Sequence, residues 1–343
     1  MNRTEISSLG EFGLIRKLTD TIKLCNESSL TAAGDDAAQI LYAEGNRTLV
    51  STDLLLEGIH FDLTYTPLRH LGYKAVVASI ADIYAMNGTP RQILVGLGVS
   101  SRFAVEDLEE LYAGINLACQ SYGVDLVGGD TSASLTGLTL SMTALGEVAP
   151  ESVATRSGAK PTDLICCTGD LGSAYMGLQL LEREKRVFAG EKEGFDPDFA
   201  GHEYILERQL KPELRLEVLQ ALRDKGIRPT SMIDISDGLS SELLHLCQAS
   251  QVGVRIYEER LPIDYETARM AEEMNLNVVT VALSGGEDYE FLFTIPLGLM
   301  DQAKEIEGIR FIGHITEASL GASLITRDGS EIALRAQGWV EQQ

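Results

Sequence analysis

Positive charge is scarce in this sequence. Its 343 residues include 28 Lys and Arg against 51 Asp and Glu, so the formal net charge is −23. A protein that binds nucleic acid through its own surface neutralises phosphates with clustered Lys and Arg, and anionic membrane surfaces attract proteins in the same way. The composition therefore predicts no nucleic-acid partner and no membrane partner. If the protein binds phosphate groups, metal cations must supply most of the positive charge.

Sulfur and nitrogen metal ligands are also few. The five cysteines form no C-x-x-C pair, and the five histidines include no His-x-x-His pattern. This argues against zinc and other metals that prefer nitrogen or sulfur. Free thiols fit a reducing compartment. The segment from Met1 to Gly10 lacks the apolar stretch of a signal peptide, and no apolar run approaches the roughly 18 residues of a membrane-spanning helix. We expect a cytoplasmic protein.

Three common catalytic motifs are missing. The sequence has no Gly-Lys pair, which excludes a Walker A loop, and no His-Arg-Asp loop of a protein kinase. It also has no Gly-x-Ser-x-Gly nucleophile turn. Phosphoryl transfer needs little beyond positioning and charge neutralisation, least of all when the acceptor is itself an anionic phosphate. A chain with many acids and no evident nucleophile or base fits that reaction.

Hydrophobic residues make up 44% of the chain, which is enough for two cores in 343 residues. Alternating helix and strand patterns predict an α/β (α+β) protein with two domains, 1–150 and 151–343. The first is expected to hold a mixed sheet with helices. Residues 69–87 are predicted as a helix, and its stretch 75–81 is apolar or small on every face, which indicates a buried helix. Residues 278–283 are predicted as a strand, and residues 189–202 as a long exposed loop.

Acidic residues recur at the ends of these predicted elements. A single Asp is usually a turn former or a helix cap. Asp82, however, lies in the apolar helix, where an unpaired carboxylate is costly. Oxygen ligands suit Mg²⁺, and the calcium-binding EF-hand pattern is absent. We expect the acids to converge on one cluster of divalent cations that holds a nucleotide triphosphate. The motifs are Gly34-Asp35-Asp36, Ser51-Thr52-Asp53, Ala81-Asp82, Gly128-Gly129-Asp130, Asp234-Ile235-Ser236-Asp237 and Gly285-Gly286-Glu287-Asp288.

Glycine turns and two basic residues are candidates for phosphate binding. The turns at 128–129, 169–172 and 285–286 could present backbone N–H groups, although ordinary tight turns explain each equally well. Arg156 and Lys160 could reach a phosphate, although a solvated surface charge explains either one.

Seven motifs occur in the order found in bacterial thiamine-monophosphate kinases, and the resemblance runs from about residue 10 to Trp339. The similar stretches are Gly34-Asp35-Asp36-Ala37-Ala38, Ser51-Thr52-Asp53 with Gly58-Ile59-His60-Phe61, Ala78 to Met86, Gly128-Gly129-Asp130-Thr131, Arg156-Ser157-Gly158-Ala159, Asp234 to Leu239, and Ser284 to Glu290.

This resemblance implies a homodimer of two-domain subunits. The N-terminal domain would bind metal and ATP and pair its strands with a second subunit, and the C-terminal α/β domain would complete the active site. The implied reaction is ATP-dependent phosphorylation of thiamine monophosphate to thiamine diphosphate by direct in-line transfer, with several Mg²⁺ ions and no catalytic side chain. The resemblance puts Asp36, Ser51, Thr52, Asp53, Asp82, Asp130, Asp234 and Asp237 at the metals. It puts Tyr112, Gly129, Asp130, Arg156 and Ser236 at ATP, and His60, Glu287 and Trp339 at thiamine monophosphate.

Two alternative functions are compatible with the sequence patterns. The chain could be another ATP-using enzyme of the superfamily, which includes aminoimidazole ribonucleotide synthetase and selenophosphate synthetase. The latter would need a reactive Cys and Lys ahead of the Gly-Asp-Asp motif, and Cys25 lacks glycine-rich surroundings. The chain could instead be a non-catalytic acidic metal-binding protein. A degenerate relative would be expected to lose ligands, whereas every metal motif here is occupied by Asp.

Overall fold

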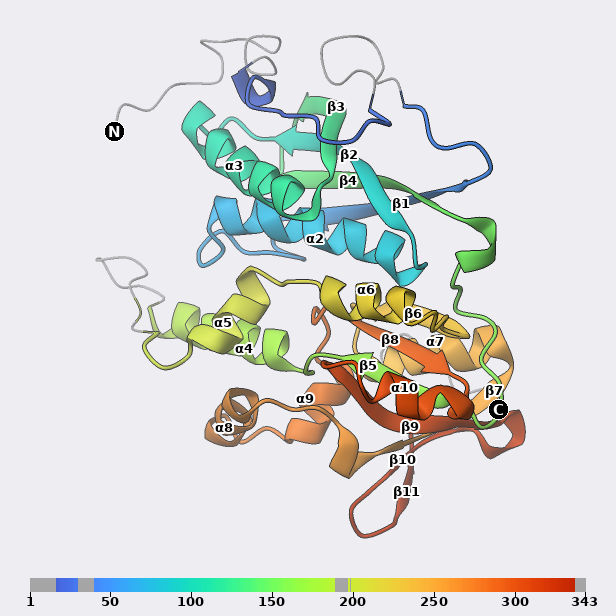
Figure 1. Ribbon diagram of the computed structural model, residues 1–343. Helices are drawn as coiled ribbons and strands as arrows, with labels where there is room; N and C mark the ends of the chain where they lie inside the picture. The colour runs from blue at the N-terminus through green and yellow to red at the C-terminus, as the bar shows by residue number, and fades with distance from the viewer. Residues whose placement is uncertain (1–16, 30–39, 189–196, 198, 337–343) are drawn as a thin grey trace. The chain divides into compact units, whose positions relative to one another are not determined.

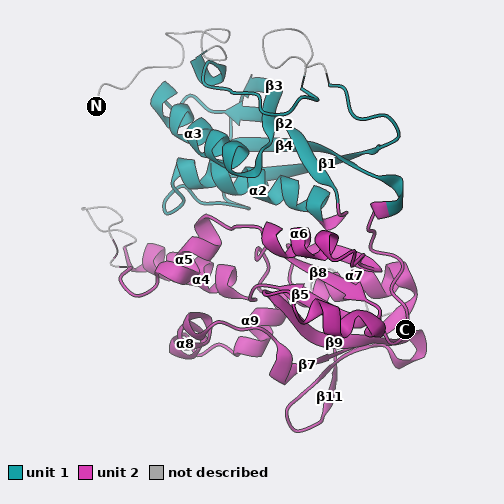
Figure 2. Cartoon of the chain, in the orientation of Figure 1, with its two compact units in different colours: residues 1–84, 88–151 teal, residues 85–87, 152–343 magenta. Residues whose placement is uncertain are grey.

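The computed structural model describes residues 17–29, 40–188, 197 and 199–336. The chain forms two compact units (Figure 2). Unit 1 consists of residues 1–84 and 88–151, and unit 2 of residues 85–87 and 152–343. The chain thus enters unit 2 briefly at the end of the first long helix, returns to unit 1, and leaves it for good after Glu151. Within the described residues, no helix is both long and apolar enough to cross a membrane.

Unit 1 is a four-stranded mixed sheet with two long helices (Figure 1). The strand order is β1-β4-β2-β3, in which β2 and β3 are parallel and β4 is antiparallel to both β1 and β2. Helix α3 connects the parallel pair, as a parallel connection requires. The elements in chain order are β1 (Arg47–Leu56), α2 (Leu68–Ala85), β2 (Thr89–Val99), α3 (Val105–Tyr122), β3 (Asp125–Ala133) and β4 (Thr139–Val148).

One face of this sheet is buried and the other is largely open. Along β4, Leu140, Met142 and Ala144 are fully buried, while the alternate residues are partly exposed. Helix α2 covers the buried face, since a Cβ on Gly146 of β4 would overlap the side chain of Ile83. The alternation of buried and exposed residues is the period-2 pattern of a sheet that packs on one side.

Helices α2 and α3 pack backbone to backbone at two glycines. A Cβ on Gly72 of α2 would overlap the carbonyl oxygen of Leu111, and a Cβ on Gly114 of α3 would overlap that of Arg69. Glycine is therefore required at both positions for this approach. Residues such as Val76, Val77 and Ile80 of α2 are fully buried, which confirms the prediction of a buried helix.

Unit 2 is built on a seven-stranded mixed sheet in the order β11-β10-β7-β9-β5-β8-β6 (Figure 1). The confirmed fold class is therefore a two-domain mixed α/β protein. The strands are β5 (Leu164–Thr168), β6 (Ser231–Ile235), β7 (Val252–Tyr257), β8 (Glu290–Ile295), β9 (Ile309–Glu317), β10 (Ala322–Ile325) and β11 (Glu331–Ala333). The helices are α4 (Ser173–Val187), α5 (Glu203–Leu210), α6 (Leu216–Asp224), α7 (Leu239–Ser250), α8 (Tyr265–Glu273), α9 (Val278–Ser284) and α10 (Met300–Ala303).

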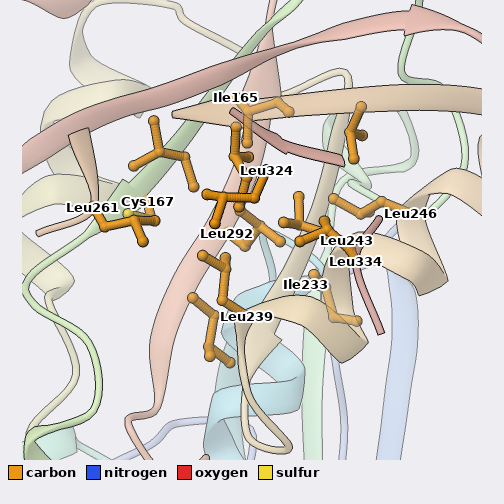
Figure 3. Packing of buried hydrophobic residues seen from close by; sticks show 14 of the residues in the cluster. Ile165, Cys167, Ile233, Leu239, Leu243, Leu246, Leu261, Leu292, Leu324 and Leu334 are labelled. Atoms are coloured by element: carbon orange, nitrogen blue, oxygen red, sulfur yellow. The ribbon is translucent and has the colours of Figure 1, made fainter. Parts of the chain in front are cut away.

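The core of unit 2 lies between the sheet and α7. Figure 3 shows Leu239, Leu243 and Leu246 of α7 packed with strand residues such as Ile233 and Leu292. All of these side chains are buried. Burial of each such side chain stabilises the fold by about 1.5–3 kcal/mol, so this layer holds the ends of β6 and α7 firmly in place.

One predicted element differs from the structure, and another lies partly outside the described residues. The predicted strand at residues 278–283 is wrong, because the segment is helix α9. The Asn277 side chain caps it by accepting a hydrogen bond from Thr280 N at 3.0 Å, and Val281 and Ala282 face the core. A short β-branched apolar run does not distinguish a strand from a buried helix. Of the predicted loop at 189–202, residues 189–196 and 198 lie outside the described residues.

Candidate functional site

The middle of β1 and helix α2 bring two carboxylates together in unit 1, since the strand continues past Asp53 to Leu56. Ser51 and Asp53 are two residues apart on a strand, so their side chains share one face. The hydroxyl of Ser51 donates a hydrogen bond to Oδ2 of Asp82, which lies on α2. Thr52 faces the opposite side, where its hydroxyl donates to the carbonyl oxygen of Met142 at 3.1 Å.

Asp53 and Asp82 form a pair of like charges. Burial raises the pKa of Asp53, and the negative charge of Asp82 raises it further. Oδ2 of Asp53 is buried and accepts no hydrogen bond within the described part of the chain. An unpaired buried oxygen beside a second carboxylate is unfavourable unless a proton or a cation compensates it. The Ser51, Asp53 and Asp82 oxygens therefore fit a hard divalent cation such as Mg²⁺.

Gly129 and Asp130 lie on β3, at the other edge of the same sheet. The strand registers align Asp130 with Gly96, Ser141 and Leu54, whereas Asp53 aligns with Met142, Val95 and Gly129. Asp130 therefore projects from the open face of the sheet, whereas Asp53 projects from the buried face. Strand β3, which carries Asp130, lies three strand spacings (roughly 14 Å) from β1, which carries Asp53. Within unit 1 the structure does not bring Asp130 to the Asp53–Asp82 pair. Gly129 has a structural role, because a Cβ there would overlap the Val95 backbone.

Two other residues expected at ligands lie in unit 1. His60 is exposed just after β1, and its Nδ1 accepts a hydrogen bond from Leu56 N at 3.0 Å. The neutral imidazole therefore carries its proton on Nε2, where it is available as a donor. Tyr112 is buried on α3, and burial raises its pKa to about 12. This position gives it a packing role in the unit 1 core.

Three polar turns meet at one end of the unit 2 sheet. Glu287 N donates to Ser236 O at 2.7 Å, so the turn at 285–289 lies directly against the end of β6. Oδ2 of Asp288 accepts from Gly172 N at 2.9 Å, which adds the turn at 169–172. The structure thus brings together Ser236, Glu287 and a third turn that are far apart in sequence. Asp234, 5% exposed, is the penultimate residue of β6, and Asp237 is exposed just after the strand.

Glu242 on α7 was not identified from the sequence. Its Oε1 accepts hydrogen bonds from Ser236 N at 3.3 Å and Asp237 N at 2.8 Å. Burial raises its pKa to about 8, with the charges of Asp237 and Asp234 adding to the effect. The available signal was an acidic residue in the first turn of an otherwise apolar helix face. Glu242 fixes the turn that carries Ser236 and Asp237.

Arg156 is exposed, and its carbonyl oxygen accepts a hydrogen bond from Oγ of Ser250, the last residue of α7, at 3.0 Å. Its positive charge lowers the pKa of His245, after a larger contribution from burial, while Asp237 acts on His245 in the opposite sense. Both Arg156 and Asp237 are therefore within electrostatic range of one imidazole. Among the described residues, no group of three or more His, Cys, Asp or Glu side chains is close enough to hold a metal ion. Asp36 and Trp339 lie outside the described residues.

The buried Asp288 carboxyl gives a testable pH dependence. It is 1% exposed, and burial raises its pKa to about 7 although Arg208 and Gly172 N–H oppose the shift. In the unfolded chain the pKa is about 4. The raised pKa therefore makes its full contribution to the free energy of unfolding below about pH 4, where the carboxyl is neutral in both states. This contribution is lost as the pH rises through 7. Relative to Asp288→Asn, the wild-type protein should lose about 1 kcal/mol of unfolding free energy per pH unit in this window.

Urea unfolding of both proteins at pH 5, 6 and 7 measures this difference. Asparagine keeps an acceptor for Gly172 N, so the hydrogen bond is matched in the two proteins. Parallel stability profiles for wild type and Asp288→Asn would show that Asp288 does not titrate in this range.

Two family models match the chain. The model described as AIR synthase related protein, N-terminal domain, matches residues 34–148, and that described as AIR synthase related protein, C-terminal domain, matches residues 161–320. The thiamine-monophosphate kinase of Bacillus subtilis (strain 168) is 31% identical over 337 residues, which span 96% of this chain and 99% of the relative.

Solved structures of thiamine-monophosphate kinases have the same fold. The crystal structure of the enzyme from Stenotrophomonas maltophilia K279a matches with a TM-score of 0.76 and 26% identity, over 93% of this chain and 95% of that chain. AaThiL complexed with AMPPCP and TMP matches with a TM-score of 0.71 and 30% identity, over 97% of each chain. The resemblance seen in the seven motifs is thus confirmed over nearly the full length, and this chain belongs to the thiamine-monophosphate kinase family of enzymes, among the AIR synthase related proteins.

Proposed function

We propose that this protein transfers the γ-phosphoryl group of ATP to thiamine monophosphate, producing thiamine diphosphate and ADP. The proposal is supported by full-length relatives named thiamine-monophosphate kinase and by a related structure, AaThiL, complexed with AMPPCP and TMP. AMPPCP is an ATP analogue in which the bridge between the β- and γ-phosphorus atoms resists cleavage, so that its γ-phosphoryl group is not transferred. The feature of this chain that carries the proposal is the Asp53–Asp82 pair, in which the buried Oδ2 of Asp53 accepts no hydrogen bond from the described residues.

Mg²⁺ is the proposed metal, and when bound it would neutralise charge on the phosphate oxygens during transfer. In unit 1, Asp53 and Asp82 would hold one ion, and Ser51 would keep Asp82 oriented through its hydrogen bond. The further proposed metal ligands are Asp36, Thr52, Asp130, Asp234 and Asp237. Because Asp130 and Thr52 project from the sheet face opposite Asp53, they would serve a different ion from the Asp53–Asp82 pair.

The proposed ligand contacts follow the chemistry of each group. Arg156, the Gly129–Asp130 backbone and Ser236 would each contact ATP, and Tyr112 would support the adenosine side from within the core of unit 1. His60 would donate its Nε2 proton to thiamine monophosphate, and Glu287 would accept from it. Trp339 would stack on the cationic thiazolium ring.

The acceptor explains why the proposed site needs no general base. The attacking atom is an oxygen of a phosphate that already carries negative charge, so no proton has to be removed from it. The work of the protein is then to align that oxygen with the γ-phosphorus and its leaving group and to neutralise charge. In-line transfer is the geometry that this alignment favours.

A homodimer formed through unit 1 is part of the proposal. Strand β1 lies at the edge of its sheet, and Val50 and Leu54 on the open face are 64% and 54% exposed. An open edge and two exposed apolar side chains favour pairing with a second copy. The roles of residues 1–150 in metal binding, ATP binding and dimerisation, and of residues 151–343 in completing the site, are proposed with it. The cytoplasmic location stays a prediction.

The direct test is incubation of the purified protein with ATP, Mg²⁺ and thiamine monophosphate, followed by chromatography. We expect one thiamine diphosphate for each ADP formed, and no product when EDTA removes the metal. Formation of ADP without thiamine diphosphate would move the acceptor to another substrate of this superfamily. Product formation that is unaffected by EDTA would contradict the role of Mg²⁺.

A further inference from the structure

The turn that carries Glu287 has an unfavourable backbone. Glu287 and Tyr289 have φ of +59° and +50°, a region that residues with a side chain rarely adopt. Such residues persist only where the surrounding structure holds them in place, and they concentrate at functional sites. The groups that hold this turn are therefore informative about what it does.

One side of the turn is held by β6. Glu287 N donates to Ser236 O, and Tyr289 N donates to Ile235 O at 2.9 Å. A Cβ on Gly286 would lie 2.8 Å from Ser236 O, so glycine is required for this approach. These contacts fix the backbone of the turn but leave the direction of the Glu287 side chain undetermined.

Helix α5 holds the other side through two consecutive buried residues. Arg208, 5% exposed, donates to the carbonyl oxygens of Asp288 at 3.2 Å and Asp170 at 3.3 Å. It also pairs with the fully buried Glu290 at 2.9 Å. Arg208 therefore ties the turn at 285–289 to the turn at 169–172.

Gln209 acts on the side chain of Glu287 itself. Its Nε2 donates to Oε2 of Glu287 at 3.0 Å, and Gln209 is 5% exposed. A buried amide on a helix has few accessible rotamers, so this bond restricts the carboxylate to one direction. Oε1 of Gln209 is also buried and accepts no hydrogen bond within the described residues. Retaining such an unpaired oxygen in a buried position is unfavourable, which indicates that the amide group is kept for its N–H donor.

We propose that Gln209 is the positioning residue that orients the Glu287 carboxylate for the thiamine substrate. The proposal rests on the function proposed above, because it takes Glu287 as a substrate contact. Gln209 itself would not touch the substrate. Loss of its N–H would let the carboxylate rotate, and each productive encounter would then require the carboxylate to be reordered.

The test variant is Gln209→Leu, which keeps the size of the side chain and removes the donor. We expect the KM for thiamine monophosphate to rise about tenfold, as loss of one charge-assisted hydrogen bond predicts, while the KM for ATP stays unchanged. Gln220→Leu is the matched control, because Gln220 is exposed on α6 and donates a hydrogen bond to a neighbouring exposed carboxylate, Asp224, at 2.8 Å. This control should leave both KM values unchanged.

A double-mutant cycle separates positioning from a general structural effect. In a Glu287→Ala background, Gln209→Leu should no longer change the KM for thiamine monophosphate, because the group that it orients is gone. Equal rises in the KM for both substrates, or an additive cycle, would overturn the proposal. If the wild-type protein forms no thiamine diphosphate, the proposed function fails instead. A crystal structure of Gln209→Leu then decides the positioning role, since an unmoved Glu287 carboxylate would refute it.

Discussion

Replacing Asp53 by asparagine is expected to lower kcat for thiamine diphosphate formation by about a hundredfold or more. The variant keeps the shape of the side chain but removes one negative charge beside Asp82. A metal held by the pair would then be bound weakly and neutralise the phosphates poorly at the transition state. The loss should appear at saturating ATP and thiamine monophosphate.

The same substitution should raise the stability of the unliganded protein. Burial and the charge of Asp82 both raise the pKa of Asp53, which means that the ionised carboxylate is unfavourable there when no metal is bound. We expect a higher Tm for Asp53→Asn than for wild type in EDTA, and a smaller rise in Tm on adding Mg²⁺. A lower Tm together with lost activity would indicate simple misfolding.

Asp301→Asn provides the control for net charge. The side chain of Asp301 is 99% exposed, and the substitution changes the charge of the protein by the same amount. It should leave kcat and the effect of Mg²⁺ on Tm unchanged. If Asp53→Asn retained near-normal kcat at saturating Mg²⁺, Asp53 could not be a metal ligand.

Gly114→Ala should destabilise unit 1 strongly. In an exposed helix this change stabilises by about 1 kcal/mol, because alanine is the better helix former. Here the added Cβ would overlap the carbonyl oxygen of Arg69 on α2, and no rotamer can relieve a clash between two backbones. The helices must separate, and we expect a net loss of about 3 kcal/mol or more of unfolding free energy. For a domain of this size, that corresponds to a fall in Tm of roughly 6–12 °C.

Differential scanning calorimetry of Gly114→Ala measures this loss. Gly298→Ala is the comparison, since a Cβ on Gly298 would meet nothing within 4 Å and its φ is not positive. That variant should unfold close to the wild-type temperature. An unchanged Tm for Gly114→Ala would mean that α2 and α3 do not pack as closely as the structure has them.

The parts of the fold that could be predicted are those with a long, consistent pattern. Helix α2 has a continuous apolar or small stretch at residues 75–81, and α3 is followed by Gly123, whose φ of +64° suits a helix terminus. The segment of α9 is predicted as a strand because its β-branched residues favour strands, whereas in the structure it is a short helix capped by Asn277 and packed on the core. The pairing order of the seven strands in unit 2 depends on contacts between distant segments, which local patterns do not encode.

The candidate site, like the fold, could be predicted from the sequence only where a local pattern is sufficient. The motif order identified the family, and strand periodicity is enough to put Ser51 and Asp53 on one face. The expectation of a single cluster could not be settled in this way, because the positions of Asp82 and Asp130 depend on how α2 and β3 pack. Glu242 and Gln209 were missed because their roles come from hydrogen bonds across 5 and 78 positions of the chain. Glu242 carries only the weak local signal of an acidic residue in the first turn of α7, and Gln209 carries none.

Because residues 85–87 belong to unit 2, the two units are not encoded by two separate continuous segments. Arg223 of α6 donates to both Oδ1 and the carbonyl oxygen of Asn87, at 3.0 and 3.1 Å, and Ala154 N donates to Met86 O. A fragment that starts at residue 152 therefore loses hydrogen-bond partners that are encoded about 65 codons upstream, so a cut there removes three residues that belong to unit 2. Domain shuffling or split-protein designs that cut at this boundary would need to supply those three residues in trans.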